Sequence, residues 1–90
     1  MAVMVTLTLK TDPQTYQSMH PQMLPMAREA GMIFHSAREV DGQVAVTDFW
    51  PSEDMWNAFA SGPLTQGMQG AGIDPPDDIK ITPLLNADGG

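Results

Sequence analysis

Residues 32–50 read MIFHSAREVDGQVAVTDFW and contain the clearest local signal in the chain. Asp41-Gly42 separates two apolar-rich runs, and this dipeptide is typical of a two-residue β-hairpin turn of type I′. The sequence therefore predicts one strand over residues 32–40 and an antiparallel partner over residues 43–50.

Two further strands are indicated near the ends of the chain. Residues 3–10 alternate between aliphatic side chains and a second set of mostly polar ones, which predicts a strand with one fully aliphatic face. Residues 79–85 alternate again, and Pro83 places that strand at a sheet edge because proline cannot donate to a neighbouring strand. We expect residues 86–90 to form a frayed tail.

Helices are expected between the strands. Asp12-Pro13 is typical of an N-cap followed by proline at the first helical position, and Gly31 is a candidate left-handed C-cap. Pro21 and Pro25 each remove a backbone donor, so this helix is expected to kink or divide into two pieces.

A second helical region follows residue 50. Ser52 is a candidate N-cap, with two acidic residues at the positive end of the helix dipole. Ser61-Gly62-Pro63 is expected to end this helix and to begin a weaker one.

The expected order of elements is strand, helix, strand, strand, split helix, strand. This order fits a single α+β domain over residues 1–90: a ferredoxin-like split βαβ arrangement with a four-stranded antiparallel sheet and helices on one face. Both faces of the predicted hairpin carry apolar side chains, and a lone two-layer domain would leave one face exposed to water. We therefore expect a homodimer.

Composition excludes several classes of partner. The chain has 4 Lys+Arg against 11 Asp+Glu, a net charge of −7, which disfavours nucleic acid and anionic membranes. The absence of cysteine excludes a disulfide framework. The chain has no basic leader and no long apolar run, so we expect a cytoplasmic protein. Two histidines without a close acidic cluster predict no metal site, and we expect no cofactor.

The hairpin register predicts a catalytic pair. If Asp41-Gly42 forms a two-residue loop, His35 lies directly opposite Asp48, and opposed residues point to the same side of the sheet. A carboxylate beside an imidazole fixes its tautomer and raises its basicity, which prepares a general base. The alternative is a structural hydrogen bond between the two side chains.

Four aromatic residues are candidates for the walls of a substrate pocket. Trp50 lies on the same predicted face as His35, where it could stack on an aromatic ligand or belong to the core. Tyr16, Trp56 and Phe59 are further candidates, although ordinary core packing is the simpler interpretation of each. His20, which precedes Pro21, is expected at the solvated surface.

The arrangement resembles the dimeric α+β barrel superfamily, most closely its antibiotic-biosynthesis-monooxygenase type, over residues 3–85. The most specific stretches are Glu29-Ala30-Gly31 and residues 46–53, VTDFWPSE, in which Trp50 matches an aromatic residue common at the end of the third strand. Where many members carry a histidine, this chain has Ala58-Phe59-Ala60. A second resemblance is to the YciI-like branch, which uses a His-Asp pair.

The family that this chain resembles includes cofactor-independent oxygenases. The resemblance therefore leaves two functions open for this chain. In the first, the dimer binds a small, largely apolar aromatic molecule and acts as a cofactor-independent monooxygenase or isomerase, with His35 as base. In the second, it is a non-catalytic ligand-binding or stress-associated dimer. Haem-degrading relatives carry an asparagine on the first strand, and residues 3–10 have none.

Overall fold

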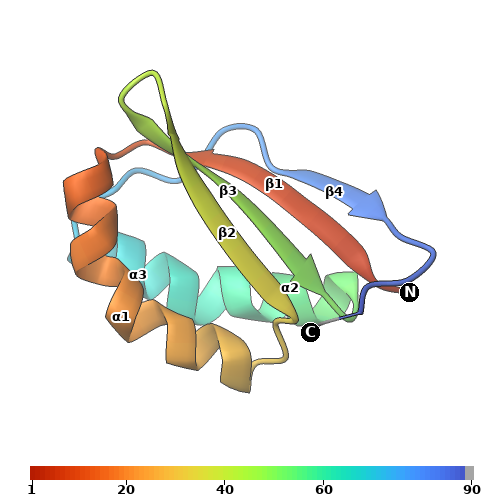
Figure 1. Ribbon diagram of the computed structural model, residues 1–90. Helices are drawn as coiled ribbons and strands as arrows, with labels where there is room; N and C mark the ends of the chain where they lie inside the picture. Colours follow the sequence, from red (N-terminus) through yellow and green to blue (C-terminus); the bar gives the residue numbers. More distant parts are fainter. Residues whose placement is uncertain (89–90) are drawn as a thin grey trace.

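The computed structural model describes residues 1–88 and has two layers, a four-stranded sheet and a layer of helices (Figure 1). The elements in chain order are β1 (Val3–Leu9), α1 (Pro13–Glu29), β2 (Phe34–Val40), β3 (Gln43–Trp50), α2 (Glu53–Phe59), η1 (Ala60–Leu64), α3 (Thr65–Gly70) and β4 (Lys80–Pro83). The strand order is β2-β3-β1-β4, and all neighbouring strands are antiparallel. The expected ferredoxin-like α+β fold is confirmed.

The β2–β3 hairpin has the predicted turn and register. Asp41 and Gly42 both have positive φ, 52° and 78°, as a type I′ turn requires. From this turn the strands pair residue by residue, and His35 comes to lie opposite Asp48. Because side chains alternate along a strand, this register decides which residues face the helices.

Of the two outcomes expected at the helix prolines, a kink or a division into two pieces, the division does not occur, because helix α1 is continuous through both of them. Its N-cap is as predicted, because the Asp12 carboxylate accepts a hydrogen bond from the Thr15 amide at 2.7 Å. Pro21 and Pro25 are four residues apart and both exposed, so water can satisfy the carbonyl groups that lose their intrahelical donors. Gly31 follows the helix with a φ of 111°, as expected for a left-handed cap.

The second helical region also continues where a break was expected. Ser52 caps α2 by accepting a hydrogen bond from the Met55 amide at 3.2 Å. From Ala60 the chain widens into the π-turn η1, which contains Pro63, and then continues into α3. The Thr65 hydroxyl donates to the Ala60 carbonyl at 2.5 Å, which helps to satisfy the acceptors freed by the wider turn.

Strand β4 lies at the sheet edge beside β1, as Pro83 suggested, but it is shorter than expected. Residues 86–88 have no regular structure, and the last two residues of the expected tail, Gly89 and Gly90, lie outside the described residues. No helix within residues 1–88 combines the length and hydropathy needed to cross a membrane.

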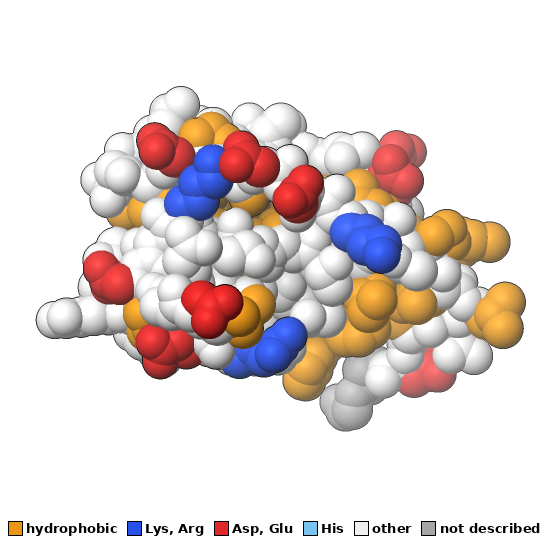
Figure 2. Space-filling model, turned by 90° about the horizontal axis from the view of Figure 1, so that it is seen from above, with side chains coloured by type: hydrophobic (Ala, Val, Ile, Leu, Met, Phe, Trp, Pro, Cys, Tyr) orange, Lys and Arg blue, Asp and Glu red, His pale blue; other side chains and the backbone are white. Residues whose placement is uncertain are grey.

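The core lies between the sheet and the helices. The helix-facing residues of β1 and β3 are buried, and Val5 and Trp50 have no exposed surface. On the open face of the sheet, threonine and serine lie among apolar side chains, which are orange in Figure 2 and adjoin one another toward the right of that view. Phe34 on this face is 55% exposed.

Candidate active site

A buried carboxylate and an imidazole meet on the helix-covered face of the hairpin. His35 on β2 and Asp48 on β3 are directly opposed, and Nδ1 of His35 lies 2.5 Å from Oδ1 of Asp48. Asp48 is only 5% exposed and is the one buried charged side chain among residues 1–88. An ionised carboxylate in this position accepts the Nδ1–H hydrogen bond and so leaves Nε2 as an acceptor.

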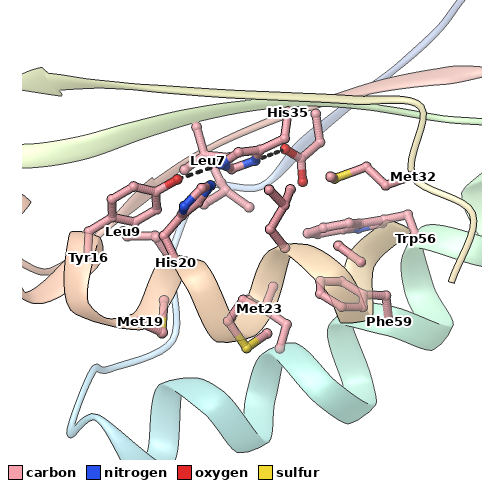
Figure 3. A pocket seen from close by; sticks show the side chains of 15 residues that line it. Leu7, Leu9, Tyr16, Met19, His20, Met23, Met32, His35, Trp56 and Phe59 are labelled. Carbon is pink, nitrogen blue, oxygen red and sulfur yellow. Dashed lines mark hydrogen bonds and ion pairs between the residues drawn. The ribbon is translucent and has the colours of Figure 1, made fainter. Parts of the chain in front are cut away.

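The other nitrogen of His35 contacts a tyrosine from α1. The Tyr16 hydroxyl lies 2.5 Å from Nε2, which accepts a hydrogen bond from this hydroxyl in the tautomer whose Nδ1–H donates to Asp48. Burial, together with the nearby charge of Asp48, raises the pKa of Tyr16 to about 12. Tyr16 is therefore a neutral donor near pH 7, and the three residues form one chain of hydrogen bonds (Figure 3).

The three hydrogen-bonded residues line one part of a cavity that lies between the sheet and the helices. The cavity has a volume of about 60 Å³ and is lined mainly by apolar side chains from β1, α1, β3, α2 and η1. Three methionines contribute to its walls: Met19, Met23 and Met32. Methionine side chains have flexible, polarisable ends, so these walls can adapt to ligands of different shape.

His20 lines the same cavity, so its expected place at the solvated surface is wrong. Its ring points from α1 toward the tyrosine–histidine pair (Figure 3), with centroids 5.6 Å from the Tyr16 ring and 5.5 Å from the His35 ring. It makes no side-chain hydrogen bond within residues 1–88. The signal in the sequence was its position four residues after Tyr16, which places both side chains on one helix face.

The remaining aromatic candidates divide into two groups. Trp56 and Phe59 on α2 line the end of the cavity away from Tyr16 (Figure 3). Trp50 does not line the cavity. Its ring packs against theirs, with centroids 6.0 Å from Trp56 and 5.3 Å from Phe59. The Trp50 Nε1–H group is buried without a hydrogen-bond partner among the described residues.

The site brings together an imidazole, a buried carboxylate and a phenol hydroxyl. Within residues 1–88, no group of three or more His, Asp or Glu side chains is arranged to hold a metal ion. The cavity is apolar and its polar groups gather at one end. Such an arrangement suits a largely apolar molecule with one ionisable group.

Comparison with known proteins identifies the fold through solved structures. No family model matches the chain, and no curated protein matches it either. A putative antibiotic biosynthesis monooxygenase from Chloroflexus aurantiacus has a TM-score of 0.65 at 13% identity, covering 99% of this chain and 98% of its own. The chain has the fold of the antibiotic-biosynthesis-monooxygenase-like structures.

Two other structures support the same fold. SnoaB, a cofactor-independent oxygenase from Streptomyces nogalater, has a TM-score of 0.65 at 13% identity, covering 96% of this chain and 93% of its own. The structural-genomics protein YJCS has a TM-score of 0.71 at 11% identity, covering 93% and 99%. The expected likeness to the fold of antibiotic-biosynthesis-monooxygenase-like proteins is thereby confirmed, whereas the single chain does not test the dimeric barrel.

Proposed function

We propose that this protein binds a small, largely apolar aromatic molecule with an acidic hydroxyl or C–H group and removes a proton from it. The observation that supports the proposal is the chain of hydrogen bonds Asp48–His35–Tyr16, which ends in an otherwise apolar cavity. The proposed reaction class is that of a cofactor-independent monooxygenase or isomerase.

The proton would reach His35 through the Tyr16 hydroxyl. A substrate hydroxyl or acidic C–H group placed against the Tyr16 oxygen gives its proton to that oxygen while Tyr16 passes its own proton to Nε2 of His35. The resulting imidazolium is stabilised by Asp48, whose carboxylate already holds Nδ1 at 2.5 Å. The pKa of Tyr16, about 12, makes a lasting tyrosinate unfavourable, so Tyr16 relays the proton and does not keep it.

In the oxygenase form of the proposal, the substrate anion supplies the electrons. It reduces O₂ in two one-electron steps, and a C–O bond forms at the carbon that carried the proton or at a conjugated ring carbon bearing hydrogen. The imidazolium of His35 returns its proton to give a hydroperoxide. Loss of water then leaves a carbonyl group, so one oxygen atom enters the product and the other leaves as water.

The cavity is smaller than an aromatic ligand requires. A dry cavity of roughly 150 Å³ is the size that holds a benzene molecule, whereas this cavity measures about 60 Å³. A ligand with one or two rings therefore needs the walls to move outward. Met19 and Met23 on α1 can supply this movement by changing rotamers.

We also propose that the protein is a homodimer formed through the open face of the sheet. Phe34, Phe49 and Met4 occupy one cross-strand row on this face, because Phe49 is opposed by Phe34 on one side and by Met4 on the other. The Phe34 and Phe49 rings are 6.1 Å apart. A second subunit covering this row would remove apolar surface from water.

One observation favours the alternative of a non-catalytic ligand-binding dimer. Both ring nitrogens of His35 already have protein partners, Asp48 and Tyr16. A histidine held in this way also satisfies the buried carboxylate without any chemistry. The two functions differ in whether a bound ligand loses a proton.

The test is oxygen consumption with anthrone and α-naphthol as trial substrates. The wild type should consume O₂ with at least one of them faster than the same solution without protein, and His35→Gln should remove the acceleration. Ligand binding without oxygen consumption or proton exchange would favour the non-catalytic alternative. Absence of binding would contradict the proposal altogether.

A further inference from the structure

We infer that His20 contacts the oxygen atom of the bound substrate and stabilises the negative charge that proton removal creates there. The inference rests on the proposed function and adds a residue to that site. It also narrows the substrate class to aromatic compounds whose acidic group forms an oxyanion, namely a phenol or an enolisable ketone.

The charges around the cavity create a need for such a contact. Asp48 already places one buried negative charge beside it. Proton removal from the substrate creates a second anion in surroundings that are mostly apolar, and an unpaired charge in such surroundings is costly. Of the described residues that line the cavity, none is a lysine or an arginine.

The His35 imidazolium does not neutralise the substrate anion, because its positive charge is paired with the Asp48 carboxylate. When His35 takes the proton, it forms an ion pair with Asp48 through the existing Nδ1 contact. Tyr16 can donate one hydrogen bond to the new anion, as it previously did to Nε2. A second donor at the same end of the cavity would spread the charge further, as in an oxyanion hole.

His20 is the polar side chain placed to be that donor. It lies one helical turn from Tyr16 on α1, and its ring centroid is 5.6 Å from that of Tyr16 and 5.5 Å from that of His35. It has no side-chain hydrogen-bond partner within residues 1–88, so its ring N–H is free to meet a ligand. In Figure 3 its ring reaches into the cavity between the helix and the hydrogen-bonded pair.

This placement predicts where the substrate oxygen lies. It occupies the polar end of the cavity between the Tyr16 hydroxyl and the His20 ring, and the aromatic body extends toward Trp56 and Phe59 at the other end. A hydrocarbon of the same shape would leave His20 without a partner. The site is therefore expected to prefer aromatic compounds that form an oxyanion over hydrocarbons of the same size.

The experiment measures the pKa of bound para-nitrophenol, whose ionised form is identified by its absorbance. The probe is titrated in the presence of saturating wild type, His20→Phe, His20→Gln and the exposed control Gln22→Ala. We expect the pKa of the bound probe to rise by about one unit in His20→Phe, which is a tenfold loss of the ionised form over the neutral form. His20→Gln keeps an N–H donor and should recover part of that loss, and Gln22→Ala should match the wild type.

Asp48→Asn separates failure of this inference from failure of the proposed function. Removing the buried carboxylate should raise the pKa of a probe held in this cavity, because the His35 imidazolium that takes the proton of the probe loses its ion-pair partner. A shift in Asp48→Asn with none in His20→Phe would contradict the role of His20 while leaving the binding site in place. If para-nitrophenol binds none of the folded proteins, both the proposed function and the inference are contradicted.

Discussion

His35 and Asp48 are thirteen residues apart in the chain yet directly opposed across the β2–β3 hairpin, with Nδ1 and Oδ1 2.5 Å apart. The Asp41-Gly42 turn produces this pairing, because a two-residue loop fixes the register of both strands. A shift by one residue would move one of the two side chains to the open face of the sheet. The candidate active site thus depends on the local geometry of a turn that lies outside the cavity.

The first prediction concerns the carboxylate that orients His35. Asp48→Asn keeps the shape of the side chain but removes its charge, so the imidazolium formed by proton transfer loses its ion-pair partner. We expect proton removal from a bound substrate to slow by about two orders of magnitude. Glu39→Gln is the matched control, because it removes an exposed carboxylate from β2. Equal rates in the two variants would contradict a role for Asp48.

The second prediction concerns the titration of Tyr16, the only tyrosine of the chain. Its pKa is raised from 10.0 to about 12, first by burial and then by the charge of Asp48. Asp48→Asn removes the second cause, so tyrosinate absorbance should appear at lower pH in that variant than in the wild type. An unchanged titration would show that Tyr16 does not sense Asp48.

The same pKa predicts how stability depends on pH. The folded protein holds the Tyr16 proton more tightly than the unfolded chain, whose tyrosine has a pKa of 10.0. This contribution is complete below about pH 10 and is lost as the pH rises through about 12. Over that interval the midpoint of thermal unfolding should fall more steeply for the wild type than for Tyr16→Phe. Parallel curves would contradict the raised pKa.

The third prediction tests whether the methionines let the cavity expand. Replacing Met19 and Met23 by leucine nearly conserves volume, and each swap should cost less than about 1.5 kcal/mol of stability. Leucine is stiffer than methionine, so the double variant should lose more affinity for α-naphthol than for phenol, as measured by calorimetric titration. An equal loss for both ligands would contradict adaptation by these side chains.

The fourth prediction tests the homodimer. Phe34→Glu places a charge in the cross-strand row of Phe34, Phe49 and Met4, where the wild-type side chain is 55% exposed in the single chain. Light scattering at micromolar concentration should give a dimeric mass for the wild type and a monomeric mass for this variant. Phe34→Leu, which stays apolar, should remain a dimer. A monomeric wild type would overturn the prediction.

The sequence was most informative where local chemistry determines the structure. The Asp-Gly turn, the Asp12 and Ser52 caps and the Gly31 stop were all predicted, because each depends on residues within a few positions along the chain. The pairing of His35 with Asp48 followed from the turn by counting residues. Those predictions needed no knowledge of how the helices pack on the sheet.

The rest depended on tertiary packing. The prolines of α1 do not break it because both face solvent, and which helix face meets the sheet is decided by the whole fold. The same rotation of α1 brings Tyr16 onto His35 and turns His20 into the cavity. Trp50 was correctly placed on the helix-covered face, but whether it or Trp56 meets the cavity depends on how α2 crosses the sheet.

The most direct test of the account is deuterium exchange into β-tetralone under nitrogen, followed by proton NMR in D₂O. This ketone has an acidic C–H group beside its carbonyl, and its exchange reports proton removal without any reaction with oxygen. The account predicts protein-catalysed exchange that is lost in His35→Gln and strongly reduced in Tyr16→Phe, with Glu39→Gln unchanged. Exchange at the uncatalysed rate in the presence of folded wild type that binds the ketone would contradict it, and the hydrogen bonds of His35 would then be structural.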